Sequence, residues 1–455
     1  MKANTLKRLL SLVLVLALTL ALTACDGGGE TTSSYADRPI QLTWASWQDQ
    51  NVDAALLEKF MELHPDIGVT QITMAQDSWD QGLFNLNSTG DLPDAFTTFD
   101  LASATANGWT LDITAMYEAD TYTDKIPTGI AQAGVYDGVR YGLATWQFPC
   151  VVFVNKTLFD MYNEPLPDAD WTMTEMVDIA RRLSQPREYT FGLCEPANYD
   201  GTEWLYRAFP VATTEGLYEW GYDPAAGTFD LTSWAEGYAL GKQLLDEQVM
   251  GNCLTDEQRE IAYGNAATPL QETGKIGMVL DWFWTCAYMK SSVMTDNGIE
   301  WLVYPQPTDS GRIQSVIDLG AVAATTPYPQ EAYELLKFMT YSAEGWTMKL
   351  DYCEANSILP TMLPIADDEA IWTRVKSFFQ GTDYEKVFDT LPQWVAEARK
   401  WTPGYGTFWD WTHGQDMFTQ LSQGVLKAKD LVPQFNDAYK QYYDECMDLI
   451  GDRKS

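Results

Sequence analysis

The chain has 455 residues, of which 64 are acidic and 29 are basic, and its formal net charge is −35. This excess of negative charge repels phosphate backbones and anionic lipid, so it argues strongly against nucleic-acid binding and, less strongly, against an anionic ligand. The only histidines are His64 and His413. Two histidines provide few candidates for a histidine-based catalytic triad or a multi-histidine metal site.

The N-terminus has the pattern of a secretory signal. Lys2, Lys7 and Arg8 precede an almost unbroken apolar run over residues 12–22. A run this short and this close to the N-terminus is typical of a cleaved signal, not of a spanning helix. We therefore predict that residues 1–24 are removed on export. The mature chain then has 26 basic and 64 acidic residues, a balance of −38.

The signal ends in Leu-Thr-Ala-Cys, the last residue being Cys25. This tetrapeptide resembles the bacterial lipobox, which implies that Cys25 is lipidated and becomes the first mature residue. A free cysteine behind an ordinary signal is the alternative. The polar, glycine-rich segment that follows is typical of a flexible linker, so we assign residues 25–37 to a tether that holds a globular body at a membrane.

Roughly 430 mature residues are more than one core usually holds, so two lobes are expected. Six further cysteines are scattered widely and lack the tight spacing of a metal site. Export permits disulfides, but the sequence cannot choose among 15 pairings and leaves unpaired thiols possible. We expect no metal or cofactor. These cysteines are Cys150, Cys194, Cys253, Cys286, Cys353 and Cys446.

The mature chain opens with alternating elements. Residues 40–47 alternate apolar and polar side chains as a half-buried strand does, residues 52–63 have helical spacing, and residues 68–74 return to strand character. This order predicts a β-α-β unit. A further short strand ends at Asp100, and a helix is expected over residues 101–107.

The central region continues with a turn between two short strands at residues 136–141 and a long extended run that ends at Asn155. A helix follows near residue 172, with Thr172 or Thr174 as its cap. A strand from Phe191 leads through a loop into another helix, and helices are also expected over residues 231–248 and 255–264.

The last third begins with a buried strand, Gly-Lys-Ile-Gly-Met-Val-Leu, that runs into Asp281 and three aromatic residues. Two more strands follow, and then a helix whose apolar side holds Ala332, Leu335, Leu336 and Met339. The tail over residues 416–449 is expected to be mostly helical. Pro433 is expected to start its last helix, because proline suits the first helical turn.

The fragments LTWASW, FMELHPDIGV, GDLPDAF, YDGVRYGLA, VVFVNKTLFDMYNEPLP, GKIGMVLDWFW and GAVAATT occur in this order. Together they resemble the extracellular solute-binding protein family 1 of ABC importers, the carbohydrate-binding group of maltose-binding-protein-like lipoproteins. The resemblance covers roughly residues 38–450.

The resemblance implies a two-lobe periplasmic-binding-protein-like α/β fold, with mostly parallel sheets flanked by helices and a hinged cleft. The N-terminal lobe would hold residues 38–145 and 305–351, and the C-terminal lobe residues 146–304 and 352–455. Chain crossings near residues 144–149, 304–307 and 351–357 would act as the hinge. The expected partners are a mono- or oligosaccharide, the permease subunits of an ABC transporter and, through Cys25, the lipid bilayer; a monomer without enzymatic activity is expected.

The cleft of an open α/β sheet lies outside the carboxyl ends of its strands, where this sequence places aromatic and acidic residues. Aromatic faces match the C–H surface of a sugar ring, while carboxylate and amide groups hydrogen-bond to its hydroxyls. The expected ligand-binding residues are Trp47, Gln48, Asp49, Asp100, Trp146, Gln147, Glu195, Asn198, Trp204, Asp281, Trp282, Trp284, Tyr405, Trp409 and Trp411.

Trp284 matches the stacking tryptophan of the family, but Trp282 and Phe283 stand where many relatives have glycine and a small residue, which implies a narrower or more aromatic pocket. We assign the other tryptophans, Trp109 among them, to packing or surface. Three alternatives stay open: a secreted glycan-cleaving enzyme, the same fold binding a cationic solute, and a surface adhesin or sensor subunit. An excess of acids over neutral hydroxyl partners in the cleft would favour a cation.

Overall fold

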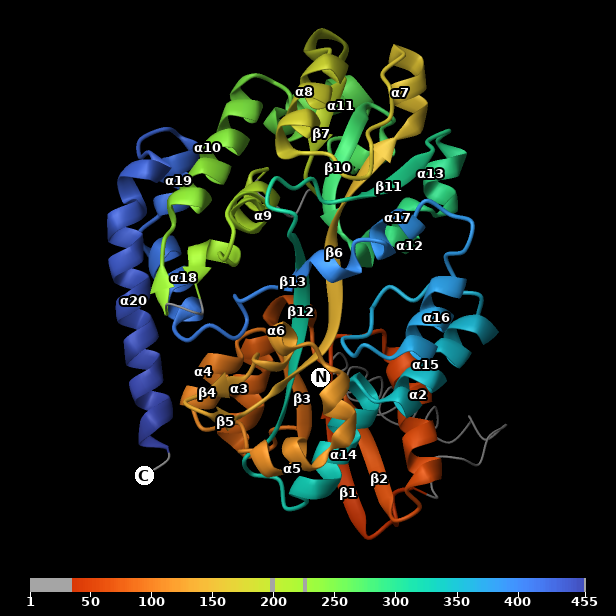
Figure 1. Cartoon of the computed structure of the whole chain (residues 1–455), viewed down its shortest axis with the longest axis vertical. Coiled ribbons are helices and arrows are strands. Elements are labelled where there is room, and N and C mark those ends of the chain that lie inside the picture. Colours follow the sequence, from red (N-terminus) through yellow and green to blue (C-terminus); the bar gives the residue numbers. More distant parts are fainter. Residues whose placement is uncertain (1–34, 197–200, 224–226, 454–455) are drawn as a thin grey trace, which may run out of the picture.

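The computed structural model describes residues 35–196, 201–223 and 227–453 (Figure 1). Within these ranges, nine strands form one continuous mixed sheet, and two short hairpins lie outside it. The sheet strands are β1 (Ile40–Ala45), β2 (Ile67–Ile72), β3 (Ala95–Thr98), β6 (Leu143–Asn155), β7 (Phe191–Cys194), β10 (Ile276–Trp282), β11 (Trp301–Pro305), β12 (Ile313–Val322) and β13 (Trp394–Ala396). The hairpins are β4 (Val135–Tyr136) with β5 (Val139–Arg140), and β8 (Tyr222–Asp223) with β9 (Thr228–Phe229).

Helices pack around this sheet (Figure 1). Those of the first half are α2 (Gln50–Leu63), α3 (Trp79–Thr89), α4 (Leu101–Ala106), α5 (Thr114–Ala119), α6 (Thr128–Ala131), α7 (Lys156–Tyr162), α8 (Met173–Leu183) and α9 (Glu203–Thr213). Those of the second half are α10 (Thr232–Asp246), α11 (Asp256–Tyr263), α12 (Cys286–Met289), α13 (Ser292–Asp296), α14 (Pro329–Thr340), α15 (Ala343–Ala355), α16 (Glu369–Ser377), α17 (Glu385–Phe388), α18 (Tyr405–Gly414), α19 (Met417–Ser422) and α20 (Ala428–Asp452).

Strand β6 runs through both halves of the molecule. Its first part, up to Pro149, pairs with β12, and its second part, from Cys150, pairs with β10 and β11. Proline lacks the backbone N–H that a ladder needs, and the change of partner falls at this residue. Figure 1 shows β6 and β12 as the long strands between the lower group β1–β3 and the upper group β7, β10 and β11.

The sheet is mixed because its crossing strands oppose their neighbours. The pairs β1–β2, β1–β3, β7–β10 and β12–β13 are parallel. The pairs β3–β12, β6–β12, β6–β10 and β6–β11 are antiparallel. Each lobe therefore keeps a parallel unit, and the connection between the lobes is antiparallel.

Two large clusters of buried side chains divide between the lobes. The first surrounds Trp44 and Phe96, and the second surrounds Val152 and Met278. The first cluster also includes side chains of α10, α18 and α20. Helix α20 packs on both α10 and α4, so the C-terminal helices run along the side of both lobes (Figure 1).

Most elements lie where the sequence predicts them. Thr172 begins α8 with a capping box to Glu175, and the apolar side of α14 is buried as expected. The prediction for Pro433 is wrong, because α20 begins at Ala428 and the proline lies inside the helix. Ala428 and Leu431 are buried, so packing stabilises the turn that precedes the proline.

Candidate functional site

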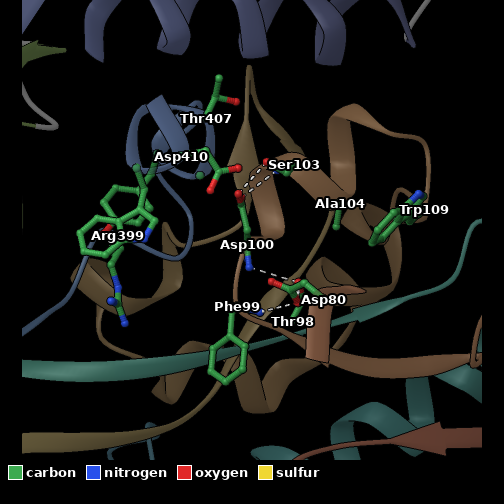
Figure 2. Close-up of a pocket in the computed structure, with 13 residues that line it drawn as sticks. Asp80, Thr98, Phe99, Asp100, Ser103, Ala104, Trp109, Arg399, Thr407 and Asp410 are labelled. Carbon is green, nitrogen blue, oxygen red and sulfur yellow. Dashed lines mark hydrogen bonds between the residues drawn. The ribbon is translucent and has the colours of Figure 1, made fainter. Parts of the chain in front are cut away.

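A pocket of about 590 Å³ lies where the end of β3 and the start of α4 face α18 (Figure 2). Its walls combine three aspartates, several hydroxyl groups and aromatic rings. The lining residues are Asp80, Thr98, Phe99, Asp100, Ser103, Ala104, Trp109, Arg399, Tyr405, Gly406, Thr407, Trp409 and Asp410.

Asp100 is placed by the helix that follows β3. Its side chain caps α4, accepting hydrogen bonds from the Ser103 amide at 2.9 Å and from the Ser103 hydroxyl at 2.6 Å. The cap satisfies the free amides of the first turn and fixes the carboxylate at the carboxyl end of β3. Burial raises the pKa of Asp100, and the charge of nearby Asp410 raises it further.

Helix α18 approaches Asp100 through a glycine. A Cβ atom on Gly406 would clash with the Asp100 carboxylate, so only glycine allows this approach. The approach brings Tyr405 and Trp409 into the pocket wall, where their rings stack at 6.2 Å and 24°. Tyr405 is buried, whereas Trp409 is half-buried and Asp410 is exposed.

The pocket is acidic. Burial, followed by the charge of Asp100, raises the pKa of Asp80 to about 6, although bonds from Phe99 and Thr98 oppose the shift. Figure 2 shows Asp100 and Asp410 close together, while the guanidinium of Arg399 points away from them. The arrangement offers several hydrogen-bond acceptors beside aromatic faces, and a cation or a polyhydroxylated ring can use both.

Trp47 does not line the pocket itself but packs against Phe99, which does. Its indole lies parallel to the Phe99 ring, with centroids 4.1 Å apart and planes at 5°. Its N–H donates to Asp318 at 3.0 Å. Phe99 lines the pocket, so Trp47 supports that wall, and Asp100, Tyr405 and Trp409 are the predicted site residues that the structure brings together there.

The other predicted site residues that follow β1 or lie in the first half of β6 serve the fold in this structure. Gln48 is buried and donates to Asp53, and Asp49 caps α2. Trp146 has no exposed surface and donates to Asp318 at 2.5 Å. Gln147 donates to the carbonyl of Pro364 at 2.8 Å. None of these four lines the pocket, and their ligand contacts stay a prediction.

The predicted residues near β10 form a second group, away from the pocket. Glu195 caps α9 by accepting from the Trp204 amide at 3.0 Å, and the Trp204 indole donates to the Asp281 carbonyl at 3.1 Å. Trp204 and Trp282 have no exposed surface. Trp284 is half-buried and stacks on Trp282 at 5.1 Å and 22°.

Asp281 is almost fully buried, and burial raises its pKa to about 7, while its bonds from the Trp282 amide and Thr285 oppose the shift. Trp411 is half-buried against Phe408 and Phe435. Ligand contacts for this group stay a prediction as well. Asn198 and Cys25 lie outside the described residues.

Sequence reasoning missed much of the pocket. Asp80 lies within a helical segment and Arg399 in an irregular one, and neither stands in a recognisable motif. Trp109, which the sequence assigns to packing or surface, is buried in the core of the first lobe, and it also lines the pocket. Asp410 lies between Trp409 and Trp411, so its position beside two aromatic residues was the one available signal.

Within the described ranges, no group of three or more histidine, cysteine, aspartate or glutamate residues could hold a metal ion. The six cysteines of this part of the chain are free thiols. None of the helices described there is long and apolar enough to cross a bilayer.

A family model for bacterial extracellular solute-binding proteins matches residues 44–345. The chain belongs to this family. Membership confirms the resemblance seen in the sequence and implies an extracellular or periplasmic location. It also identifies the chain as a binding protein, not an enzyme.

Solved structures confirm the two-lobe α/β fold. An ABC substrate-binding protein from Listeria monocytogenes in complex with cycloalternan has a TM-score of 0.64 and 18% identity, with 91% of this chain and 100% of that chain covered. The GacH receptor of Streptomyces glaucescens has a TM-score of 0.66 and 17% identity, covering 89% and 98%.

A solute-binding protein from Thermotoga lettingae bound with α-D-tagatose has a TM-score of 0.65 and 16% identity, covering 89% and 100%. At these identities the likeness shows the fold alone. No curated protein sequence matches the chain significantly.

Proposed function

We propose that this protein captures a sugar or oligosaccharide in the pocket between β3 and α18. The observation that carries the proposal is the combination, within about 590 Å³, of aromatic side chains with three aspartates and the hydroxyls of Thr98, Ser103 and Thr407. Aromatic faces cover the C–H surface of a pyranose, and the polar groups accept or donate hydrogen bonds to its hydroxyls. The solved relatives bound to cycloalternan and tagatose support this ligand class.

A cationic solute is the second candidate, because Asp80, Asp100 and Asp410 outnumber the single guanidinium of Arg399, which points away from them. Of the neutral amides expected in the cleft, Gln48 donates to Asp53 and Gln147 donates to the carbonyl of Pro364, and Asn198 lies outside the described residues. Aromatic rings with carboxylates nearby hold cations as well as sugars.

A thermal-shift screen followed by calorimetry distinguishes the two candidates. The panel holds neutral mono- and oligosaccharides in one arm, and quaternary amines and polyamines in the other. We expect a neutral sugar to raise the melting temperature, and Trp409→Ala to reduce its affinity about five-fold through the lost stacking face. Tyr162→Ala, a half-buried aromatic in α7, is the control. Binding only in the cationic arm would replace the sugar proposal.

We further propose that the protein is anchored to the outer face of the membrane through lipidated Cys25 and delivers its ligand to an ABC permease as a monomer. The family and the N-terminal sequence support this. Closure would occur between residues 38–145 with 305–351 and residues 146–304 with 352–455, which agrees with the change of partner along β6 at Pro149.

The anchor is tested by Cys25→Ser. We expect the variant protein to leave the membrane fraction and appear in the medium or periplasm, because serine lacks the thiol to which the lipid would be attached. Retention of the variant at the membrane after a high-salt wash would contradict the anchor.

A further inference from the structure

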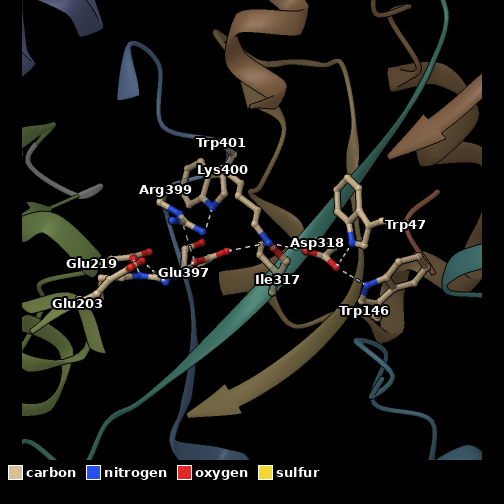
Figure 3. Close-up of polar contacts among 11 residues, drawn as sticks. Trp47, Trp146, Glu203, Glu219, Ile317, Asp318, Glu397, Arg399, Lys400 and Trp401 are labelled. Atoms are coloured by element: carbon tan, nitrogen blue, oxygen red, sulfur yellow. Dashed lines mark hydrogen bonds and ion pairs between the residues drawn. The ribbon is translucent and has the colours of Figure 1, made fainter. Parts of the chain in front are cut away.

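A group of charged side chains extends from Glu219 through Glu397 and Lys400 to Asp318 (Figure 3). Glu397, which directly follows β13, is at its centre and has no exposed surface. Its carboxylate accepts from Arg207 at 3.3 Å, lies 3.2 Å from the Lys400 ammonium and 4.0 Å from the Arg399 guanidinium. One carboxylate therefore faces three cations.

Arg207, which pairs with Glu397 at one end of the group, lies in α9. Trp204, Leu205 and Ala208 of this helix are in the core of the second lobe. Arg207 is 3% exposed and also contacts Glu219 at 2.5 Å and Glu203 at 3.1 Å. Because its guanidinium has donors in a fixed fork, it holds these carboxylates in one relative position.

At the other end of the group, Lys400 contacts β12, at residues that belong to the first lobe. Its ammonium binds the Asp318 carboxylate and donates to the Ile317 carbonyl at 3.1 Å. Asp318 in turn accepts the indole N–H groups of Trp47 and Trp146. Trp47 stacks on Phe99, so this chain of contacts ends at the pocket wall.

The group of charged side chains lies beside the part of β12 where the strand passes from the core of the second lobe to the core of the first. Val316 packs in the core of the second lobe, whereas Ile317 packs in that of the first. The pairing of β12 with β6 shifts register between Ile317 and Leu319, which places Asp318 at the irregularity. A break in the ladder is a place where two rigid halves can turn relative to each other.

Buried ion pairs contribute little net stability, because the cost of desolvation offsets the attraction, but losing one partner leaves a costly unpaired charge. The pKa directions agree with this interdependence: burial raises the pKa of Glu397, although Lys400 opposes the shift. The pKa of Glu219 is lowered, because Arg207 and Arg399 outweigh the effect of burial. The group thus favours the one arrangement of the lobes in which these charges are paired, because other arrangements would leave buried charges without partners.

We propose that Glu397 is a positioning residue that latches the two lobes in the orientation that forms the pocket, by binding Arg207 of α9 and Lys400 next to Asp318 at the same time. Arg399 lines the pocket, and the Lys400 carbonyl accepts the amide of Leu101 at the start of α4 at 2.9 Å. The segment that carries Glu397 therefore sets the distance between α18 and β3. The proposal holds whichever solute the pocket binds.

The test compares Glu397→Gln with Glu164→Gln in the mature protein without added ligand. Glu164 also pairs with an arginine, the exposed Arg182, but both partners lie within the second lobe, so this pair does not connect the lobes. We expect Glu397→Gln to increase the radius of gyration in small-angle scattering and to speed amide exchange over residues 315–320 by roughly ten-fold, while Glu164→Gln resembles the wild type. A merely stabilising glutamate would lower the melting temperature without changing the radius.

Arg207→Lys is the second variant for the case that Glu397→Gln does not fold. It keeps the positive charge but cannot reach three carboxylates with one ammonium. We expect the same increase in radius. A wild-type radius and wild-type exchange over residues 315–320 in a folded variant of either kind would overturn the latch. Because no sugar enters the experiment, that result leaves the proposed ligand class untouched.

Discussion

Two segments of this chain combine acids with tryptophans, but one segment is buried in the core and the other lines the pocket. Asp281, Trp282 and Trp284 follow the apolar run of β10, whereas Trp409 and Asp410 belong to α18. Trp282 has no exposed surface and Asp281 is almost fully buried, while Asp410 is exposed and Trp409 lines the pocket.

The difference follows from the elements that carry the two segments. Strand β10 has β6 on one side and β7 on the other, and the side chains along it are buried. A central strand covered on both faces buries a carboxylate as readily as an indole. Helix α18 packs only one side against the core, so the residues on its other side can face a ligand.

The strongest test of this contrast is Trp282→Ala. We expect a loss of about 3–5 kcal/mol in the free energy of unfolding, because the substitution leaves a cavity among fully buried neighbours. Denaturant unfolding measures the loss. A loss below about 1 kcal/mol would mean that the β10 segment is not core.

Asp281→Asn tests the burial of the acid. The folded-state pKa of about 7 lies well above the ordinary value of an aspartate, 3.8, so the folded protein holds the extra proton and loses stability as pH rises from about 4 to 7. Asparagine keeps the acceptor without the charge. We expect the variant to be more stable than the wild type by about 2–4 kcal/mol at pH 8 and similar at pH 4, measured by denaturant unfolding at both values. An equal difference at both pH values would contradict the raised pKa.

Gly406→Ala tests the other region. The added methyl group would clash with Asp100 and push α18 away, so we expect roughly a ten-fold loss of affinity for the pocket ligand, about 1.4 kcal/mol. Calorimetry with the sugar found in the screen measures it. Gly414→Ala in the same helix meets no atom within 4 Å and serves as the control, with unchanged affinity and a gain of up to about 1 kcal/mol in stability. Equal affinity in both variants would separate α18 from the ligand site.

Trp284→Ala should have the smallest effect on binding. The motif alone predicts a loss of about 1–3 kcal/mol in sugar affinity through the missing stacking face. The half-buried ring instead packs on Trp282 and Phe148 and does not line the pocket, so we expect affinity within two-fold of the wild type by calorimetry. A loss as large as the motif predicts would place the ligand at the end of β10.

The sequence by itself was enough for the fold class and for most elements. Period-two spacing identified β1, helical spacing identified α2, and an apolar run identified β10, while the order of short motifs indicated the family. These signals are local, because the spacing of apolar side chains along a strand or helix indicates which of its faces is buried.

Only the tertiary structure decided which acids and rings face a common space. The clash-free approach of Gly406 to Asp100 joins segments more than 300 residues apart in the chain, and Asp80 and Arg399 stand in no motif. The position of β10 between two other strands buried Trp282, although its own sequence resembles a ligand loop. Exposure depends on what a distant part of the chain places opposite a side chain, and no local pattern contains that information.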